Sequence, residues 1–260
     1  HKIQYAIDNA SAGHTLNVWA WTYNEVILID ESITLIGNSS STTNIIAGTE
    51  EYDSGNNPYI VKITADNVVV KNLNFTATTS DFDILYSSNN DSISLLNNIF
   101  FYSSAFDSST STVNLQYSDN HTISGNIIYP GEGSLRLEYV SNCLINNNLL
   151  SSSAAGGSLH VEYSDNNIFE NNTLDDSQYG MYFGGSDYNI IRNNTVISQM
   201  SNCYSCISYG GIRLGDSDNN TIIANNVTLS AIGVTIGGGL GSHDNTISDN
   251  NLSNNNIGIY

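Results

Sequence analysis

Basic residues are scarce in this sequence: 6 Lys and Arg stand against 25 Asp and Glu, for a formal net charge of −19. Nucleic acid and anionic membrane surfaces are bound through clustered basic residues, so this balance argues against both as partners. No apolar run approaches the ~18 residues of a membrane span, so no spanning segment is predicted. The chain begins without a signal peptide, which leaves it cytosolic, already processed or a fragment.

Cysteine is also rare, because three residues are too few for a disulfide scaffold. Cys203 and Cys206 have the spacing of a redox or zinc half-site, but no second Cys pair or flanking His completes a metal site. We therefore predict a local disulfide between them. Cys143 is predicted to be a free, partly buried thiol, with pairing to the Cys203–Cys206 loop as the alternative.

An Asn-Asn pair recurs almost from end to end of the chain, most clearly in YSDNNIFENNTL at residues 163–174. The copies are separated by 22 to 32 residues, and such a period is typical of a solenoid. Aligned on the second Asn of the pair, the copies fall at Asn72, Asn98, Asn126, Asn148, Asn172, Asn194, Asn226 and Asn251.

Each repeat contains two or three short alternating segments, such as NIFEN at 167–171, which are too short for helices. Asn and Ser-Asp separate them, where corners need residues that tolerate left-handed backbone. A coil of about 22 residues then holds roughly three strands, rises by about 4.8 Å and stacks its Asn amides into a ladder. The sequence predicts an all-β, single-stranded parallel β-helix. A disordered low-complexity chain is disfavoured, because apolar residues keep register with the Asn pairs.

One domain is predicted over residues 1–260, with a capping helix at 1–13, irregular first coils at 14–58 and regular coils at 59–260. Three longer inserts, at 99–113, 149–158 and 196–211, fall between the same pair of strands and are expected to project from one side. At the far end, SDNNLSNNNIGIY stops within a coil and has no closing helix. The natural chain therefore continues, or another subunit docks there.

The opening segments resemble those of a known superfamily: a short "IQ-AID-A-AG" helix, then TLNVWAWTYNE at 15–25 and SITLIG at 32–37. They are similar to the start of the right-handed parallel β-helix proteins, which include pectate lyases. The pattern is closest to the NosD-type carbohydrate-binding or surface-repeat branch, and suggests an archaeal-like surface protein. The Asn-Asn coils of 61–260 match the same family, although His14 stands where such openings often carry Asp. The resemblance implies a right-handed coil whose helix plugs its open end.

Metals and cofactors receive little support. Copper, which the NosD resemblance suggests, requires clusters of Met, His or Cys, and the chain has 2 Met and 5 scattered His. The segment DSDNN at 216–220 could hold Ca²⁺ through its oxygens, but it is an ordinary corner of the repeat without an EF-hand pattern. No metal site and no cofactor are predicted.

The strand before each Ser-Asp corner should present one outward column of side chains along the solenoid, because side chains alternate on a strand. The predicted column is Lys62, Leu85, Gln116, Glu138, Glu162, Tyr182, Arg213 and Thr235, and a second column two residues earlier contains Asp83, Asn114, Arg136, His160, Gly180, Gly211 and Gly233. Seven of these residues form a candidate carbohydrate-binding face: Lys62, Arg136, Glu138, His160, Glu162, Tyr182 and Arg213.

Paired carboxylates on such a face could act in glycoside hydrolysis, and an Arg or Lys could act as base in a uronide lyase. The interpretation that we favour is a solvated charge ladder that stabilises an exposed sheet. Of the motifs that polygalacturonase-like enzymes carry, only the Asp175–Asp176 pair is present, and the calcium-binding Asp cluster of pectate lyases cannot be assembled. No catalytic residue is assigned.

The sequence contains ten Asn-x-Ser/Thr sequons, which favour an extracellular, glycosylated protein. They are Asn9, Asn38, Asn74, Asn90, Asn120, Asn171, Asn193, Asn219, Asn226 and Asn251. Together with the unclosed last coil, they predict a structural β-helix protein of a cell-surface layer, sheath or filament, forming a homo-oligomer or polymer. The alternative is a carbohydrate-active protein, either a lyase or hydrolase or a binding module, with a polysaccharide as its partner.

Overall fold

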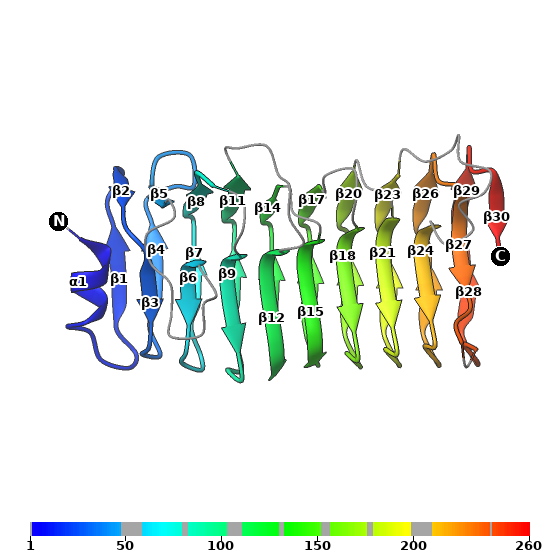
Figure 1. Ribbon diagram of the computed structural model, residues 1–260, viewed down its shortest axis with the longest axis horizontal. Coiled ribbons are helices and arrows are strands. Elements are labelled where there is room, and N and C mark those ends of the chain that lie inside the picture. The colour runs from blue at the N-terminus through cyan, green and yellow to red at the C-terminus, as the bar shows by residue number, and fades with distance from the viewer. Residues whose placement is uncertain are drawn as a thin grey trace.

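The chain winds into a long solenoid whose termini lie at opposite ends (Figure 1). The computed structural model describes residues 2–47, 59–79, 83–102, 111–129, 133–151, 157–175, 179–198, 210–239 and 241–260. Within these ranges, strands from successive coils pair in parallel to form three ten-stranded sheets, here named A, B and C. The predicted parallel β-helix is therefore confirmed.

Each coil contributes one strand to each sheet in the order A, B, C. Sheet A contains β1 Thr15–Val18, β4 Thr34–Gly37, β7 Val69–Lys71, β10 Ser94–Leu96, β13 Thr122–Ser124, β16 Leu144–Asn146, β19 Ile168–Glu170, β22 Ile190–Arg192, β25 Thr221–Ile223 and β28 Thr246–Ser248. Sheet B contains β2 Thr22–Asn24, β5 Asn44–Ala47, β8 Asn74–Ala77, β11 Ile99–Tyr102, β14 Ile127–Ile128, β17 Leu149–Ser151, β20 Thr173–Asp175, β23 Thr195–Ile197, β26 Asn226–Thr228 and β29 Asn251–Ser253. Sheet C contains β3 Ile27–Ile29, β6 Tyr59–Ile63, β9 Asp83–Ser88, β12 Ser111–Asp119, β15 Gly133–Ser141, β18 Gly157–Glu162, β21 Tyr179–Gly184, β24 Gly210–Gly215, β27 Ile232–Ile236 and β30 Ile257–Ile259.

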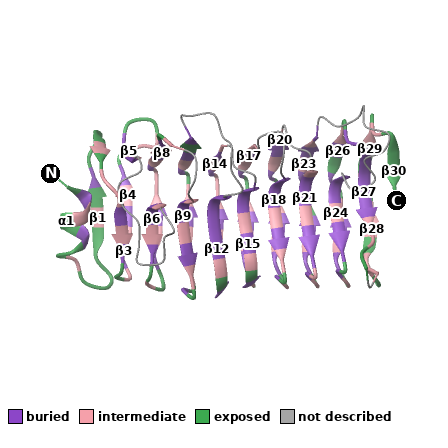
Figure 2. Ribbon diagram, in the orientation of Figure 1, coloured by how far each residue is buried: buried purple, intermediate pink, exposed green. Residues whose placement is uncertain are grey.

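The core is one continuous apolar column that runs along the inside of the three sheets (Figure 2). Strands alternate between buried and partly exposed residues, because successive side chains point to opposite faces of a sheet. Like side chains stack between coils, as Phe75 does on Phe100 with ring centroids 5.2 Å apart. The alternation seen in the sequence therefore places one face of every strand in this column.

The short helix α1, Ile3–Ile7, covers the first coil. The Gln4 side chain accepts the Leu28 backbone N–H at 2.7 Å and donates to the Leu28 carbonyl at 3.1 Å, so it replaces the missing neighbour of β3. The predicted plug is confirmed, although the helix is shorter than residues 1–13. The expectation of irregular coils over 14–58 is wrong for residues 15–47, where strands alternate as they do later in the chain.

Asn side chains form a buried ladder at the corner between sheets A and B. Each Oδ1 accepts a backbone N–H of the preceding coil at 2.8–3.1 Å, and each Nδ2 donates to a carbonyl of that coil at 2.8–2.9 Å. Buried polar groups must be paired in this way to avoid a desolvation cost. The ladder consists of Asn98, Asn126, Asn148, Asn172, Asn194, Asn225 and Asn250.

The predicted alignment of the ladder is one residue wrong in three coils. The ladder contains Asn225 and Asn250 where Asn226 and Asn251 were predicted, and Leu73 holds the equivalent position where Asn72 was predicted. The reason is that the residue before each ladder position adopts positive φ. Ala224, with φ 55°, takes that place before Asn225, so the second Asn of the pair moves outward into β26.

The corner between sheets C and A explains the Ser-Asp-x-Asn motif. The Ser164 Oγ accepts the Val140 N–H at 2.9 Å, and the Asn167 Oδ1 accepts the Cys143 N–H at 2.9 Å. Asp165 accepts the Asp187 N–H at 2.7 Å, while Asn166 holds the left-handed position with φ 59°. Each residue of the motif thus ties one coil to the next.

The three longer inserts connect sheet B to sheet C, at β11–β12, β17–β18 and β23–β24. Their shared position in the topology agrees with the prediction. Most of their residues lie outside the described ranges.

Candidate carbohydrate-binding face

The outward face of sheet C carries two stacked columns of residues, most of them polar. Column one consists of Lys62, Tyr86, Asn114, Arg136, His160, Tyr182, Arg213 and Thr235. Column two consists of Ser88, Gln116, Glu138, Glu162, Gly184 and Gly215.

The predicted columns mixed these two sets. Lys62, Tyr182 and Arg213 stack in line with Arg136 and His160, and not with the glutamates. Leu85 is buried in the core, and Gly180, Gly211 and Gly233 also occupy buried positions. The physical reason is that Gly184 and Gly185 separate the MYF triplet from its Ser-Asp corner, which shifts Tyr182 two residues away from the corner.

The centre of the face is an ion-pair network across neighbouring coils. The Arg136 guanidinium contacts Glu138 at 3.2 Å and Glu162 at 3.0 Å, and Gln116 donates to Glu138 at 3.1 Å. His160 Nε2 lies 3.3 Å from a Glu162 oxygen, in a direction that does not form a hydrogen bond. Arg136 and both glutamates are only partly exposed, so these charges interact more strongly than a fully solvated surface pair.

Aromatic and acidic groups extend the network along column one. The ring of His160 lies 4.9 Å from that of Tyr182, and the Arg213 guanidinium lies over the same Tyr182 ring at 5.4 Å. On the other side, Asp83 accepts from the Asn114 amide at 2.9 Å and from the Ser111 N–H at 3.0 Å. The predicted residues Arg136, Glu138, His160, Glu162, Tyr182 and Arg213 are therefore brought together, while Lys62 lies three coils away from Arg136 and over the ring of Tyr59.

Burial perturbs three titratable groups of this face. It raises the pKa of Asp83 to about 6, against the opposing effects of Asn114, Ser111 and Arg136. It lowers the pKa of His160, although the Glu162 carboxylate acts in the opposite direction. It also raises the pKa of Tyr182, which Arg213 partly offsets. Near neutral pH the face therefore combines a neutral imidazole with fixed charges of both signs.

The network is not fully satisfied. Among the residues that the structure describes, seven buried polar side-chain atoms have no hydrogen-bond partner within the chain; four of them, on Asn114, Arg136, His160 and Thr235, lie in column one, and the other three are on Thr79, Asn146 and Ser158. Each such group costs roughly 1–3 kcal/mol when it is left unpaired. Column one therefore holds more of these unpaired atoms than any other part of the chain that the structure describes.

A feature that the sequence analysis missed is a ladder of three tyrosines at the edge of this face, Tyr117, Tyr139 and Tyr163. Their rings stack at 4.9 Å with interplanar angles of 9° and 16°. All three have positive φ, between 49° and 54°, which costs a bulky residue roughly 1 kcal/mol. Asn89, Gly185 and Asp216 hold the same position in other coils. The sequence signal was a Tyr directly after Gln116, Glu138 and Glu162, which are stacked positions of three successive coils.

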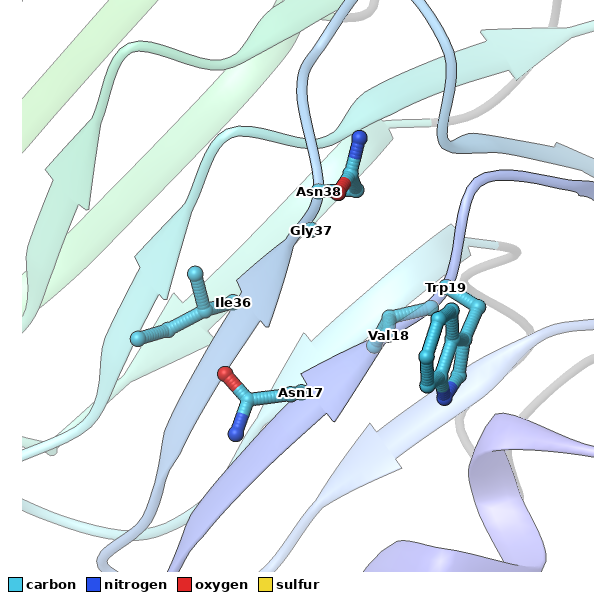
Figure 3. A pocket seen from close by; sticks show the side chains of 6 residues that line it. All are labelled: Asn17, Val18, Trp19, Ile36, Gly37 and Asn38. Carbon is cyan, nitrogen blue, oxygen red and sulfur yellow. The ribbon is translucent and has the colours of Figure 1, made fainter.

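A small pocket opens between the first two strands of sheet A (Figure 3). Asn17 and Val18 of β1 and Ile36 and Gly37 of β4 line it, with the exposed Trp19 beside them. None of its lining residues carries a charge, and it lies at the N-terminal end, away from the network.

The remaining predicted positions are scattered. Cys203 and Cys206 lie outside the described residues, whereas Cys143 is a free and buried cysteine, as predicted. Asn90 is buried, and its amide donates to Ile63, Ser87 and Ser88, so a glycan there would have to break these contacts. Asn74 is half-buried, and eight other sequon residues are exposed: Asn9, Asn38, Asn120, Asn171, Asn193, Asn219, Asn226 and Asn251.

The family described as "Periplasmic copper-binding protein (NosD)" matches residues 20–260, so the chain belongs to the NosD family. Its fold is a right-handed parallel β-helix of the pectate-lyase-like kind. A search of curated proteins found no match.

Several solved structures share the fold at low sequence identity. A DFA-IIIase from Arthrobacter chlorophenolicus A6 in complex with GF2 is 11% identical, with a TM-score of 0.60 and coverage of 90% of this chain and 78% of that one. A mutant of the periplasmic alginate epimerase AlgG is 11% identical, with a TM-score of 0.60 and coverage of 96% and 68%. The Dettilon tailspike protein is 13% identical, with a TM-score of 0.57; the match covers 91% of this chain but only 55% of the tailspike.

The described residues do not fit the copper site that the family description implies. They contain no cluster of three or more His, Cys, Asp or Glu side chains placed to hold a metal. The adjacent pair His121 and Cys143 is buried, and both ring nitrogens of His121 are engaged, by the Ile93 N–H and by Ser118. Burial also raises the pKa of the Cys143 thiol to about 12, which disfavours the thiolate that copper binds.

Proposed function

We propose that this protein binds a polysaccharide along the outward face of sheet C. The observation that carries the proposal is the network of Arg136, Glu138 and Glu162 beside His160 and Tyr182, on stacked positions of three neighbouring coils. Fixed donors, acceptors and an aromatic ring at a spacing of about 4.8 Å suit the repeated hydroxyls of a glycan. The structural neighbours, which include an alginate epimerase and a DFA-IIIase, support this class of ligand.

The test is calorimetric titration with a panel of oligouronates and neutral gluco- and fructo-oligosaccharides. Arg136→Met should weaken binding roughly tenfold or more, because it leaves two carboxylates of the face unpaired. Arg192→Met is the matched control, since Arg192 forms a comparable ion pair with Glu170 on sheet A. Equal losses in both variants, or no binding to any member of the panel, would contradict the proposal. Mass analysis of the incubated oligosaccharides would show whether binding is accompanied by turnover.

A location outside the cytoplasm goes with this function. The family description is periplasmic, and among the described residues no helix has the length and apolarity to cross a membrane. Exposed sequons such as Asn171 and Asn193 offer attachment points for glycans in an extracellular setting. Intact-mass measurement of the native protein tests whether the sequons carry glycans. An unmodified chain would remove the support that the sequons give to this location.

A structural, self-associating role is the second candidate. The last strand, β30, leaves Ile257 40% and Ile259 53% exposed, and both are apolar residues on an edge strand. Such an edge can pair with a further strand, whether from the same chain or from another copy. Electron microscopy of native material would show ordered polymers if this function holds, and dispersed monomers if it does not.

A further inference from the structure

Stacking within the tyrosine ladder leaves two aromatic faces uncovered, one at each end of the stack. In the middle of the stack, Tyr139 has Tyr117 on one side and Tyr163 on the other, and it is the least exposed of the three at 43%. Tyr117 and Tyr163, at the two ends, are 52% and 55% exposed. Only these two rings can therefore accept a flat partner on a face.

The two ends of the ladder differ in what lies beyond them. Asn89 holds the position next to Tyr117, and its side chain is bonded to Ser88. Gly185 holds the position next to Tyr163, where an added Cβ would come within 3.0 Å of the ring. The missing side chain at Gly185 leaves the outer part of the Tyr163 face uncovered.

Polar groups surround this uncovered face. Tyr182 extends over Gly184, so that a Cβ there would lie 2.6 Å from the Tyr182 hydroxyl. Glu162 precedes Tyr163 in the chain and belongs to the ion-pair network of the binding face. Tyr163 and Asp216 hold the positions of the two coils on either side of Gly185, so both lie beside the uncovered face.

We propose that the outer face of Tyr163 is a sugar-stacking subsite, in which a pyranose ring lies over Gly185, beside the Tyr182 ring that covers Gly184, with its hydroxyls directed to Glu162 and to the Tyr182 hydroxyl. The inference rests on the proposed function and names a subsite of the same face. An aromatic ring bordered by hydrogen-bonding groups matches a sugar, whose C–H face is apolar and whose rim is polar.

The backbone supports a functional origin for these tyrosines. Left-handed positions favour Gly and Asn, and the fold accepts Asn89, Gly185 and Asp216 at the same place in other coils. Three successive Tyr residues are therefore not required to turn the corner. Residues held in unfavourable backbone regions concentrate at binding sites, where another demand selects the side chain.

The experiment compares two variants with a matched control by calorimetric titration of the tightest-binding oligosaccharide of the panel. Tyr163→Asn removes the ring but suits its positive φ, so it should weaken binding roughly tenfold while the melting temperature stays equal or rises. Gly185→Asn, which keeps the ring but covers its face, should weaken binding to a similar degree. Tyr188→Asn is the control, because Tyr188 is 58% exposed with φ 57° and lies in the same kind of corner, but at the left-handed position that Asn166 holds in the preceding coil and not in the tyrosine ladder, so it should bind like the wild type.

Loss of binding in the first two variants with the control unchanged supports the subsite. If the wild type binds and Arg136→Met abolishes binding, but Tyr163→Asn and Gly185→Asn bind within twofold of the wild type, the subsite is wrong and the proposed function stands. Equal weakening by Tyr188→Asn also overturns the subsite. A wild-type protein that binds none of the panel overturns the subsite together with the proposed function.

Discussion

The two corner ladders solve the same problem with different residues. Between sheets A and B, the ladder is asparagine in every coil from Asn98 to Asn250. Between sheets C and A, asparagine begins only at Asn167, and the two preceding coils carry His121 and Cys143. The comparison shows that a corner requires an acceptor for the N–H of the preceding coil. Asparagine satisfies this need and also donates, whereas His and Cys do so only in part.

The asparagine ladder between sheets A and B should be the more sensitive of the two to substitution. Asn148→Leu leaves the Asn126 N–H and amide without their acceptor and the Ile123 carbonyl without its donor. We expect a loss of about 4 kcal/mol, because each buried group left unpaired costs roughly 1–3 kcal/mol. Thermal unfolding followed by circular dichroism measures it.

Asn226→Leu serves as the control for this substitution, since Asn226 is exposed directly after a ladder position. It should change stability by less than about 0.5 kcal/mol. Similar effects of the two substitutions would show that burial of the ladder does not determine its contribution.

His121, in the ladder between sheets C and A, should make the stability of the protein depend on pH. Its Nδ1 accepts the Ile93 N–H, so the neutral ring is held, and burial lowers the pKa of His121 to about 4. The unfolded chain binds a proton near pH 6.5, so this group's contribution is complete above that pH and is lost as pH falls toward 4. The unfolding free energy of the wild type, measured relative to that of His121→Asn, should therefore increase by about 3 kcal/mol from pH 4 to pH 6.5. Urea unfolding across this range measures the difference.

Asp83 provides a contrast of opposite sign within the same pH range. Because its pKa is raised to about 6, its contribution is present below the unfolded value of 3.8 and is lost as pH rises through 6. The stability of the wild type relative to Asp83→Asn should therefore fall as pH rises, over the same interval in which its stability relative to His121→Asn increases. Slopes of the same sign for both residues would contradict these assignments.

Cys143 tests whether an asparagine is the better ladder residue. The thiol is a weak acceptor for the His121 N–H at 3.0 Å, and Asn167 holds the equivalent position in the next coil. Cys143→Asn should stabilise the protein by about 1 kcal/mol, as judged by its melting temperature. A lower melting temperature would mean that the site has adapted to the smaller sulfur-bearing side chain.

The smallest effect is expected at Ala224, which precedes the ladder residue Asn225 in the coil where the Asn pair is displaced by one residue. Ala224 occupies a left-handed position that Asn147, Asn171 and Asn193 hold in other coils. Ala224→Asn should stabilise the protein by roughly 0.5–1 kcal/mol, because Asn tolerates this backbone region better than Ala. A neutral or destabilising result, again from thermal unfolding, would show that the corner does not discriminate between these residues.

The sequence by itself determined the parallel β-helix, the helical cap at its start and the asparagine ladder, because alternation, corner residues and the repeat period are local properties of the chain. It also found most of the residues that meet on the face of sheet C. Only the tertiary structure decided which of them stack, for example Tyr182 with His160 and Glu162 with Gly184. Coil lengths vary, so register is set by hydrogen bonds between coils and not by spacing along the chain. For the same reason the tyrosine ladder and the shift from Asn226 to Asn225 emerged only when the coils were stacked.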